Sequence, residues 1–282
     1  MTTTEQTTAA AAPCIGAAPP LHYRHVIWIV MENKAERSVL GSSDAPYVNH
    51  LASRCGTASD YHAITHPSLP NYLALTSGST HGVTDDGAPS EHPLPGPSIF
   101  SEVAASGGTW ATYAESMPAA CDATSSGKYA TKHNPALYYT DLAASCPLDD
   151  VPLGTVSAGA LSTALAADTL PSFVLVVPNL CNDTHDCDVE DGDHWLSQWM
   201  TAILDSPAYG SGETAVFVTW DEDDKAHRNH VGLVAVAPSI RAGTVATSAF
   251  THLSLLRTTE ELLGLQGTLV PGASPMRAAF GL

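Results

Sequence analysis

The sequence predicts an α/β fold with a mostly parallel central sheet. Three continuous apolar, β-branched runs, HVIWIVM (25–31), SFVLVV (172–177) and TAVFVTW (214–220), are typical of strands buried on both faces, as in parallel sheets. Segments with helical patterning separate these runs, and strands that alternate with helices are typical of α/β domains. We therefore expect residues 23–282 to form a single domain around these strands.

The other elements follow from local patterning. The connection from Asp221 to His230 is shorter than the dozen or so residues that a parallel crossover needs. The strand expected over 231–237 is therefore antiparallel to the strand over 214–220, or follows a tight loop, and either way places His230 near the sheet edge of Asp221. Residues 1–22, rich in Thr, Ala and Pro, are expected to be a disordered tail that Cys14 tethers. We further predict a strand over 108–113, helices over 47–54, 99–105, 161–167, 195–204 and 251–263, and loops over 119–152 and after residue 264.

The charge is strongly acidic. Eleven Lys and Arg residues stand against 29 Asp and Glu residues, so the net charge is −18. Such a surface repels nucleic acids and anionic lipid headgroups, which excludes a nucleic-acid partner. It also repels a phosphorylated substrate, unless a bound cation inverts the local field.

The six cysteines indicate an exported protein with up to three disulfides, because their number is even and no CxxC motif occurs. Cys181 with Cys187, and Cys121 with Cys146, are the plausible local pairs; six buried thiols in a cytosolic enzyme are the alternative. No run of about 18 apolar residues could span a membrane. The N-terminal residues do not form a signal peptide as they stand. A mature chain behind a new Met, or a low-complexity leader on an intracellular protein, would begin this way.

The segment HPSLPNYLALTSGSTHG (66–82) carries the clearest catalytic pattern. Pro70 suits the first turn of a helix that Gly78 ends, which would place Ser68 at the N-cap. Free backbone N–H groups and the helix dipole there favour a phosphate, and a hydroxyl at that position could attack phosphorus. The alternative is that Ser68 only caps the helix.

Polar side chains follow each of the three buried strands, and parallel strands would bring them to one sheet edge. Carboxylates packed so closely repel one another unless a cation lies among them. Oxygen ligands suit Ca²⁺, Mg²⁺ or Mn²⁺, and nearby histidines also allow Zn²⁺. With Ser68 the pattern indicates metal-assisted phosphoryl transfer, in which a histidine protonates the leaving alcohol. The residues concerned are Glu32, Asn33, Asp183, His185, Asp221 and Glu222.

Seven short motifs in the same order resemble the bacterial phosphoesterase family of the alkaline phosphatase superfamily, which holds secreted acid phosphatases and phospholipases C. The resemblance covers about residues 25–265 and implies an alkaline phosphatase-like, three-layer αβα sandwich. The motifs are VMEN (30–33), HPSLPNY (66–72), YAESMP (113–118), KHNP (132–135), PNLCNDTHDC (178–187), GDHWL (192–196) and TWDEDD (219–224).

The same resemblance implies roles for single residues. Ser68 matches the nucleophile, and paired acids match the metal ligands. For an isolated histidine, a structural place in the core or on the surface is the alternative. The expected metal ligands are Glu32, Asn33, Asp221, Glu222 and Asp183; the expected catalytic residues are Ser68, His66, His185 and His230; the expected substrate-binding residues are Asn71, His133 and Asn134.

These observations predict a secreted enzyme that hydrolyses phosphate monoesters with a divalent metal ion (Ca, Mg, Mn or Zn). The chain lacks room for the extra domains of large phospholipases C, although a phospholipase C-like phosphodiesterase and a non-catalytic cation-binding protein remain alternatives. The expected partner is a small phosphorylated substrate or a phospholipid headgroup, and the expected state is a monomer. A separate ion could also bind Asp186, Asp188, Asp191 and Asp193.

Overall fold

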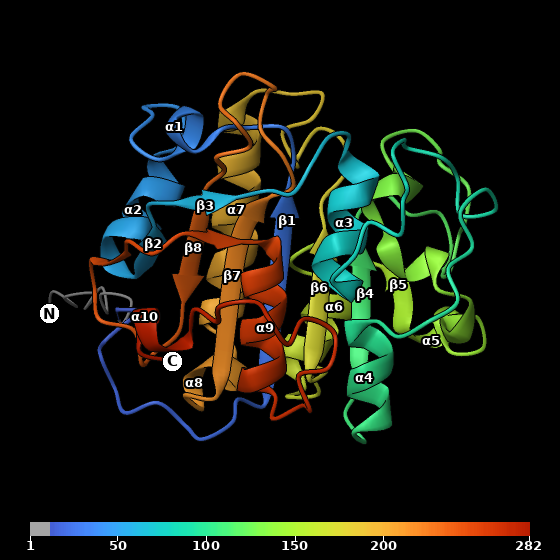
Figure 1. Ribbon diagram of the computed structural model, residues 1–282. Coiled ribbons are helices and arrows are strands. Elements are labelled where there is room, and N and C mark those ends of the chain that lie inside the picture. The colour runs from blue at the N-terminus through green and yellow to red at the C-terminus, as the bar shows by residue number, and fades with distance from the viewer. Residues whose placement is uncertain (1–11) are drawn as a thin grey trace, which may run out of the picture.

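The computed structural model describes residues 12–282, and an eight-stranded sheet crosses its centre (Figure 1). The strand order is β5-β4-β6-β1-β7-β8-β2-β9, and a separate two-stranded sheet pairs β10 with β3. The strands are β1 (His25–Met31), β2 (Gly56–Ala58), β3 (Tyr61–His62), β4 (Trp110–Ala114), β5 (Asp150–Pro152), β6 (Phe173–Val177), β7 (Thr214–Trp220), β8 (Leu233–Val236), β9 (Thr244–Ala246) and β10 (Phe250–Thr251).

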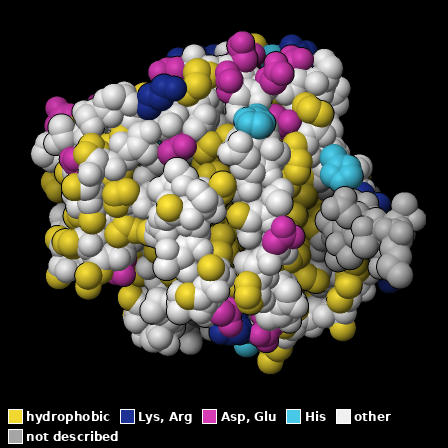
Figure 2. All heavy atoms as spheres, turned by 180° about the vertical axis from the view of Figure 1, so that it is seen from behind, with side chains coloured by type: hydrophobic (Ala, Val, Ile, Leu, Met, Phe, Trp, Pro, Cys, Tyr) yellow, Lys and Arg dark blue, Asp and Glu magenta, His cyan; other side chains and the backbone are white. Residues whose placement is uncertain are grey.

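The three apolar runs are neighbours in the sheet and run parallel, as predicted. β1 lies between β6 and β7, so the residues that follow these three strands share one edge of the sheet. β8 is antiparallel to β7, which confirms the expectation from the short connection. Seen from behind, acidic side chains gather at the upper end of the molecule, where β1 finishes in Figure 1 (Figure 2).

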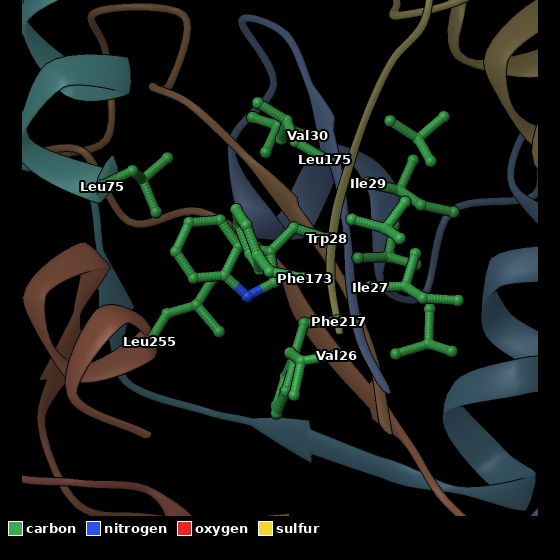
Figure 3. Close-up of a cluster of buried hydrophobic side chains, with 14 of the residues drawn as sticks. Val26, Ile27, Trp28, Ile29, Val30, Leu75, Phe173, Leu175, Phe217 and Leu255 are labelled. Carbon is green, nitrogen blue, oxygen red and sulfur yellow. The ribbon is translucent and has the colours of Figure 1, made fainter. Parts of the chain in front are cut away.

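β1 is buried along its whole length because helices cover both faces of the sheet. Trp28 points toward Leu75 and Leu255 on one side, whereas Ile27 and Ile29 point to the other (Figure 3). Trp28 Nε1 also donates a hydrogen bond to Thr259 Oγ1 over 3.0 Å, which joins β1 to the helix over 252–262. Buried strands with such two-sided packing explain the unbroken apolar runs.

The helices form two outer layers, so the predicted three-layer αβα sandwich is confirmed. α3 and α9 contact each other on the Trp28 side. On the other side α7 contacts α2 and α6, and its Gly192 lies against Met31 of β1. Within the described residues no helix combines the length and apolarity needed to cross a bilayer. The α-helices are α1 (Glu36–Val39), α2 (Pro46–Arg54), α3 (Ser68–Ser77), α4 (Ile99–Ala105), α5 (Cys146–Asp149), α6 (Ala160–Ala166), α7 (Val189–Leu204), α8 (Pro207–Gly210), α9 (His252–Leu262) and α10 (Arg277–Phe280), and the 3₁₀ helices are η1 (Thr131–His133), η2 (Pro135–Tyr138) and η3 (Thr140–Leu142).

Several short elements differ from the prediction. The expected loop over 119–152 holds η1–η3, α5 and the edge strand β5, and the expected C-terminal loop holds α10. α7 begins at Val189, six residues before the predicted start, because its polar first turns have tertiary partners. Asp193 there accepts the N–H groups of Tyr47 and Val48 over 2.9 and 2.8 Å, which caps α2. Both carboxylate oxygens of Asp193 therefore already accept hydrogen bonds from the N-terminus of α2.

Residues 12–22 pack against the rest of the chain, so the expected disorder is corrected for this part; residues 1–11 lie outside the described residues. Cys14 pairs with Cys55, and the N–H of Gly16 donates to the carbonyl of Ile240 over 2.9 Å. The two predicted disulfides, Cys121–Cys146 and Cys181–Cys187, are also present. All six cysteines are thus paired.

Candidate active site

Ser68 is the first residue of α3, and Pro67 occupies the N-cap position. The expectation that Ser68 itself caps the helix is wrong, since its hydroxyl makes no bond to the helix backbone. Instead Ser68 Oγ donates a hydrogen bond to Glu32 Oε2 over 3.0 Å. Gly78 ends α3 with φ 81°, as predicted, in a conformation that favours glycine.

Glu32 is the centre of the site. It follows β1 directly and is fully buried. Its Oε1 accepts a hydrogen bond from the Tyr72 hydroxyl over 2.8 Å and lies 3.2 Å from His133 Nε2. Tyr72 stands four residues after Ser68, so both side chains project from one face of α3 toward the same carboxylate.

The residues after β7 lie beside this carboxylate. Asp221 Oδ1 accepts the N–H of Asn33 over 3.1 Å. Glu222 Oε2 accepts from Asn71 Nδ2 over 3.3 Å, and His66 Nδ1 lies 3.1 Å from the same oxygen. Asn71 also donates to the Thr65 carbonyl over 2.8 Å. Its amide therefore fixes the segment before Ser68 rather than facing a ligand.

The residues after β6 complete the cluster. The Glu32 N–H donates to the Asp183 carbonyl over 2.7 Å, and Asp183 Oδ2 lies 3.2 Å from His133 Nδ1. Asp183 Oδ1 accepts the N–H of His185 over 2.8 Å. The Cys181–Cys187 disulfide closes this loop, so Asp183 and His185 are held in a short turn.

The carboxyl groups raise one another's pKa in this buried setting. Burial, and then the charges of Asp221 and Asp183, raise the pKa of Glu32 well above its usual range. Burial and Glu222 raise the pKa of Asp221 to about 8. Burial raises the pKa of Asp183 to about 7, whereas burial, Lys132 and His185 lower the pKa of His133 well below its usual range. Such a cluster is stabilised by a cation or by bound protons.

The cluster fits a divalent cation. Glu32, His133 and His185 offer donor atoms that lie within 4.8 Å of one another. Asp183 Oδ2, Asp221 Oδ2 and His133 Nε2 are buried and lack a hydrogen-bond partner, although native proteins satisfy nearly all such atoms. An ion bound at this edge would give such atoms a partner, which supports the expectation of a metal here.

A pocket of about 330 Å³ opens beside Ser68. Its wall includes the predicted residues Asn33, Glu222 and His185 and two residues that were not singled out, Lys132 and Asp86. Lys132 Nζ donates to Asp86 Oδ2 over 3.0 Å and lies 3.4 Å from His185 Nε2. His185 Nδ1 donates in turn to Asp186 Oδ1 over 2.7 Å. The ring therefore presents Nδ1–H to Asp186 and Nε2 to Lys132.

Two predicted site residues lie elsewhere. His230 stacks on His62 with ring centroids 5.0 Å apart, and it is not part of the pocket wall. Asn134 is fully buried and donates to both carboxylate oxygens of Asp150 over 2.9 and 3.0 Å. It joins η1 and η2 to the edge strand β5 and does not line the pocket.

Several residues at the site have no role assigned to them in the sequence prediction, among them Tyr72, Lys132 and Asp86. The spacing of four between Ser68 and Tyr72 on a helix is a signal that could have identified Tyr72. Lys132 precedes His133 within the KHNP motif. Asp86 belongs to an irregular connection without periodicity, and only its tertiary contacts reveal it.

Comparisons with known proteins identify the family of this chain. The model of the family described as the phosphoesterase family matches residues 27–266. A phosphatidylinositol-3-phosphatase of Mycobacterium tuberculosis (strain ATCC 25618 / H37Rv) is 33% identical over 277 residues, which cover 96% of this chain and 88% of the relative. An acid phosphatase of Aspergillus fumigatus is 27% identical over 228 residues, covering 76% of this chain and 50% of the relative. This chain thus spans about half the length of that fungal enzyme.

Solved structures share the fold at low sequence identity. A protein in the alkaline phosphatase superfamily from Vibrio parahaemolyticus superposes with a TM-score of 0.65 at 12% identity, covering 89% of this chain and 69% of that one. The lipoteichoic acid synthase LtaP from Listeria monocytogenes gives a TM-score of 0.61 at 10% identity, covering 93% and 75%. The sheet and its layers are therefore alkaline phosphatase-like. With the family match over most of its length and relatives that are phosphatases, this chain belongs to the phosphoesterase family and is a phosphoric ester hydrolase.

Proposed function

We propose that this protein hydrolyses phosphate monoesters, with Ser68 as the nucleophile. The observation that carries the proposal is the Ser68 hydroxyl at the first turn of α3, hydrogen-bonded to the buried Glu32 and open to a pocket that holds Lys132. The helix N-terminus and the ammonium both favour a phosphate beside the hydroxyl. A pure cation-binding site would need neither group. Both relatives described above are named as phosphatases, which supports a monoester substrate.

We further propose a divalent cation held by Glu32, Asn33, Asp221 and Glu222, with Asp183 beside them. The raised pKa values and the unpaired buried oxygen atoms support this assignment. Such an ion lowers the pKa of a nearby hydroxyl and polarises a phosphoryl oxygen. Mg²⁺, Ca²⁺ and Mn²⁺ suit a carboxylate-rich ligand set, and the nearby histidines also admit Zn²⁺.

The chain's own residues then perform the transfer. Ser68 Oγ forms a bond to phosphorus, its proton passes to Glu32, and the bond from phosphorus to the ester oxygen breaks. His185 lines the pocket, and we propose that its ring acts in the doubly protonated form, in which Nδ1–H faces Asp186 and Nε2 gives its proton to the leaving alcohol. Asp186 orients the ring through Nδ1. Water then attacks the phosphoserine and gives a proton back to His185, the bond from phosphorus to Ser68 Oγ breaks, Glu32 returns the serine proton to Oγ, and inorganic phosphate leaves.

His66 and His133 have supporting places in this scheme. His66 lies between Glu222 and Asp223, 3.1 Å from one carboxylate and 3.3 Å from the other. His133 lies between Glu32 and Asp183 and stacks on Tyr72 at a centroid distance of 5.4 Å. We propose that both hold these carboxylates in place, because neither ring is part of the pocket wall.

We propose that the protein is exported and monomeric. Its three disulfides support export, since such bonds persist in oxidising compartments. A net charge of −18 favours mutual repulsion between copies. The same charge repels an anionic bilayer, which favours a soluble monoester over a membrane lipid as the substrate.

The test compares hydrolysis of p-nitrophenyl phosphate and bis-p-nitrophenyl phosphate between about pH 4 and pH 9. Each assay is run before and after chelation, with Mg²⁺, Ca²⁺, Mn²⁺ and Zn²⁺ added back singly. Monoester turnover that chelation abolishes and one ion restores is the expected result. Preference for the diester would instead indicate a phospholipase C-like enzyme. Metal binding without turnover of either ester would leave a binding protein.

A further inference from the structure

Asp86 bridges two groups beside the proposed nucleophile. Its Oδ1 accepts the backbone N–H of Leu69 over 3.0 Å, and its Oδ2 accepts from Lys132 Nζ over 3.0 Å. Asp86, Lys132 and Ser68 all belong to the pocket wall. The carboxylate of Asp86 has no role in the reaction proposed above.

The groups that Asp86 occupies are those that a phosphate on Ser68 would use. Helix N-termini bind anions through their unpaired N–H groups. In the first turn of α3, Pro70 has no N–H, so Ser68 and Leu69 supply the donors, and Asp86 takes the one on Leu69. The expectation of free N–H groups at this helix end is thus only partly met. Lys132, which lies 3.4 Å from His185 Nε2, is also already paired with Asp86.

The bridge is held in place by its surroundings. Asp86 lies in the irregular connection between α3 and α4, but the carbonyl of the next residue, Gly87, accepts the hydroxyl of Tyr138 over 2.8 Å. Tyr138 is buried in η2. The carboxylate of Asp86, with a side chain 31% exposed, therefore sits at the mouth of the pocket on an anchored loop.

We infer that Asp86 is an internal competitor of phosphate, whose carboxylate must yield Lys132 and the Leu69 N–H before a phosphoryl group can use them. This inference rests on the proposed function. A carboxylate and a phosphate are both anionic acceptors, so they compete for the single Leu69 N–H and for the charge of Lys132, and they repel each other when close. The consequence is weak binding of inorganic phosphate, the product, and hence its ready release.

The test is the dissociation constant of inorganic phosphate, measured by titration calorimetry on the full-length, cation-loaded protein. Asp86→Asn removes the charge but keeps an oxygen that can accept the Leu69 N–H. We expect this variant to bind phosphate at least about fivefold more tightly than the wild type, because like charges at close range oppose binding. Adding Lys132→Met to Asp86→Asn should remove most of this gain, because the ammonium for which Asp86 and phosphate compete is then absent.

Asp85→Asn is the matched control. Asp85 is the preceding residue, pairs with His92 over 2.6 Å and does not line the pocket. This variant loses the same charge and should leave phosphate affinity unchanged. Thermal unfolding reports whether each variant is folded, and Asp86→Ala serves as a second variant of the same position.

Unchanged or weaker phosphate binding by the folded Asp86 variants, or no binding by any form, would overturn the inference. An equal gain in Asp85→Asn would overturn it too, since it would show a general charge effect. Hydrolysis of p-nitrophenyl phosphate by the wild type is scored separately. Turnover by the wild type without tighter phosphate binding in Asp86→Asn refutes this inference alone. Absence of turnover refutes the proposed function, and the phosphate affinities of the Asp86 variants still decide the inference.

Discussion

The hydroxyl of Ser68 donates to Glu32 Oε2 over 3.0 Å, across 36 positions of sequence. The bond joins the first turn of α3 to the end of β1, the central strand of the three that converge on the site. It also gives the serine proton a buried acceptor. The position of Ser68 is therefore coupled to the carboxyl cluster.

Ser68→Ala should abolish hydrolysis of p-nitrophenyl phosphate, by a factor of about a thousand or more, because the group that attacks phosphorus is lost. The matched control is Ser77→Ala in the same helix, whose hydroxyl donates to the Leu73 carbonyl over 2.8 Å. Both variants are checked for folding by thermal unfolding. Retained turnover in a folded Ser68→Ala variant would remove Ser68 from the role of nucleophile.

His185→Asn should slow the hydrolysis of alkyl phosphates by about 10²- to 10⁴-fold, the usual range for loss of a general acid. Hydrolysis of p-nitrophenyl phosphate should change much less, because p-nitrophenolate leaves without a proton. His194→Asn is the control, since His194 is exposed on α7 and bonds to Gln198. Equal losses for both kinds of ester would argue against proton donation by His185.

A divalent cation should stabilise the protein more at pH 8 than at pH 5. Without the cation, burial raises the pKa of Asp183 and Glu222 to about 7 and that of Asp221 to about 8, so the folded state holds protons that the unfolded state releases. The free energy of unfolding therefore falls as pH rises through this range. The cation displaces these protons, so its affinity rises with pH.

The measurement for this prediction is the melting temperature with chelator and with each cation at both pH values. The cation-dependent increase should shrink strongly in Asp221→Asn and persist in Glu190→Gln, an exposed acid at the start of α7. An increase of the same size at pH 5 and pH 8 would contradict the assignment of the ion to these carboxyl groups.

Asp150→Asn should make stability less dependent on pH. Burial raises the pKa of Asp150 from 3.8 to about 7, although the bond from Asn134 opposes this shift. The stability that the neutral carboxyl contributes is complete below pH 4 and is lost as pH rises through 7. As pH rises from 4 to 8, the free energy of unfolding of the wild type should therefore fall relative to that of the variant, by up to about 4 kcal/mol.

Denaturant unfolding at several pH values between 4 and 8 measures this difference. Asp141→Asn, an exposed change in η3, is the control and should show a constant difference. A constant difference for Asp150→Asn as well would mean that this carboxyl is ionised in the folded protein throughout the range.

Local apolar patterning was enough to predict the α/β class, the three central strands and most of the long helices. The bounds of β7 and α4 match the prediction, because each has an apolar pattern that ends sharply in polar residues. The convergence of Glu32, Asp183 and Asp221 followed from the rule that parallel strands bring their carboxyl ends to one edge.

Which polar residues share the pocket depends on how the loops pack against one another. Asn134 belongs to the KHNP motif and His230 was expected at the sheet edge of Asp221, yet His230 stacks on His62 and Asn134 binds Asp150. Asp86 reaches the site through a loop whose path depends on the anchor at Tyr138. Local patterning reports which face of an element is buried, whereas contacts between loops depend on long-range packing that no local pattern encodes.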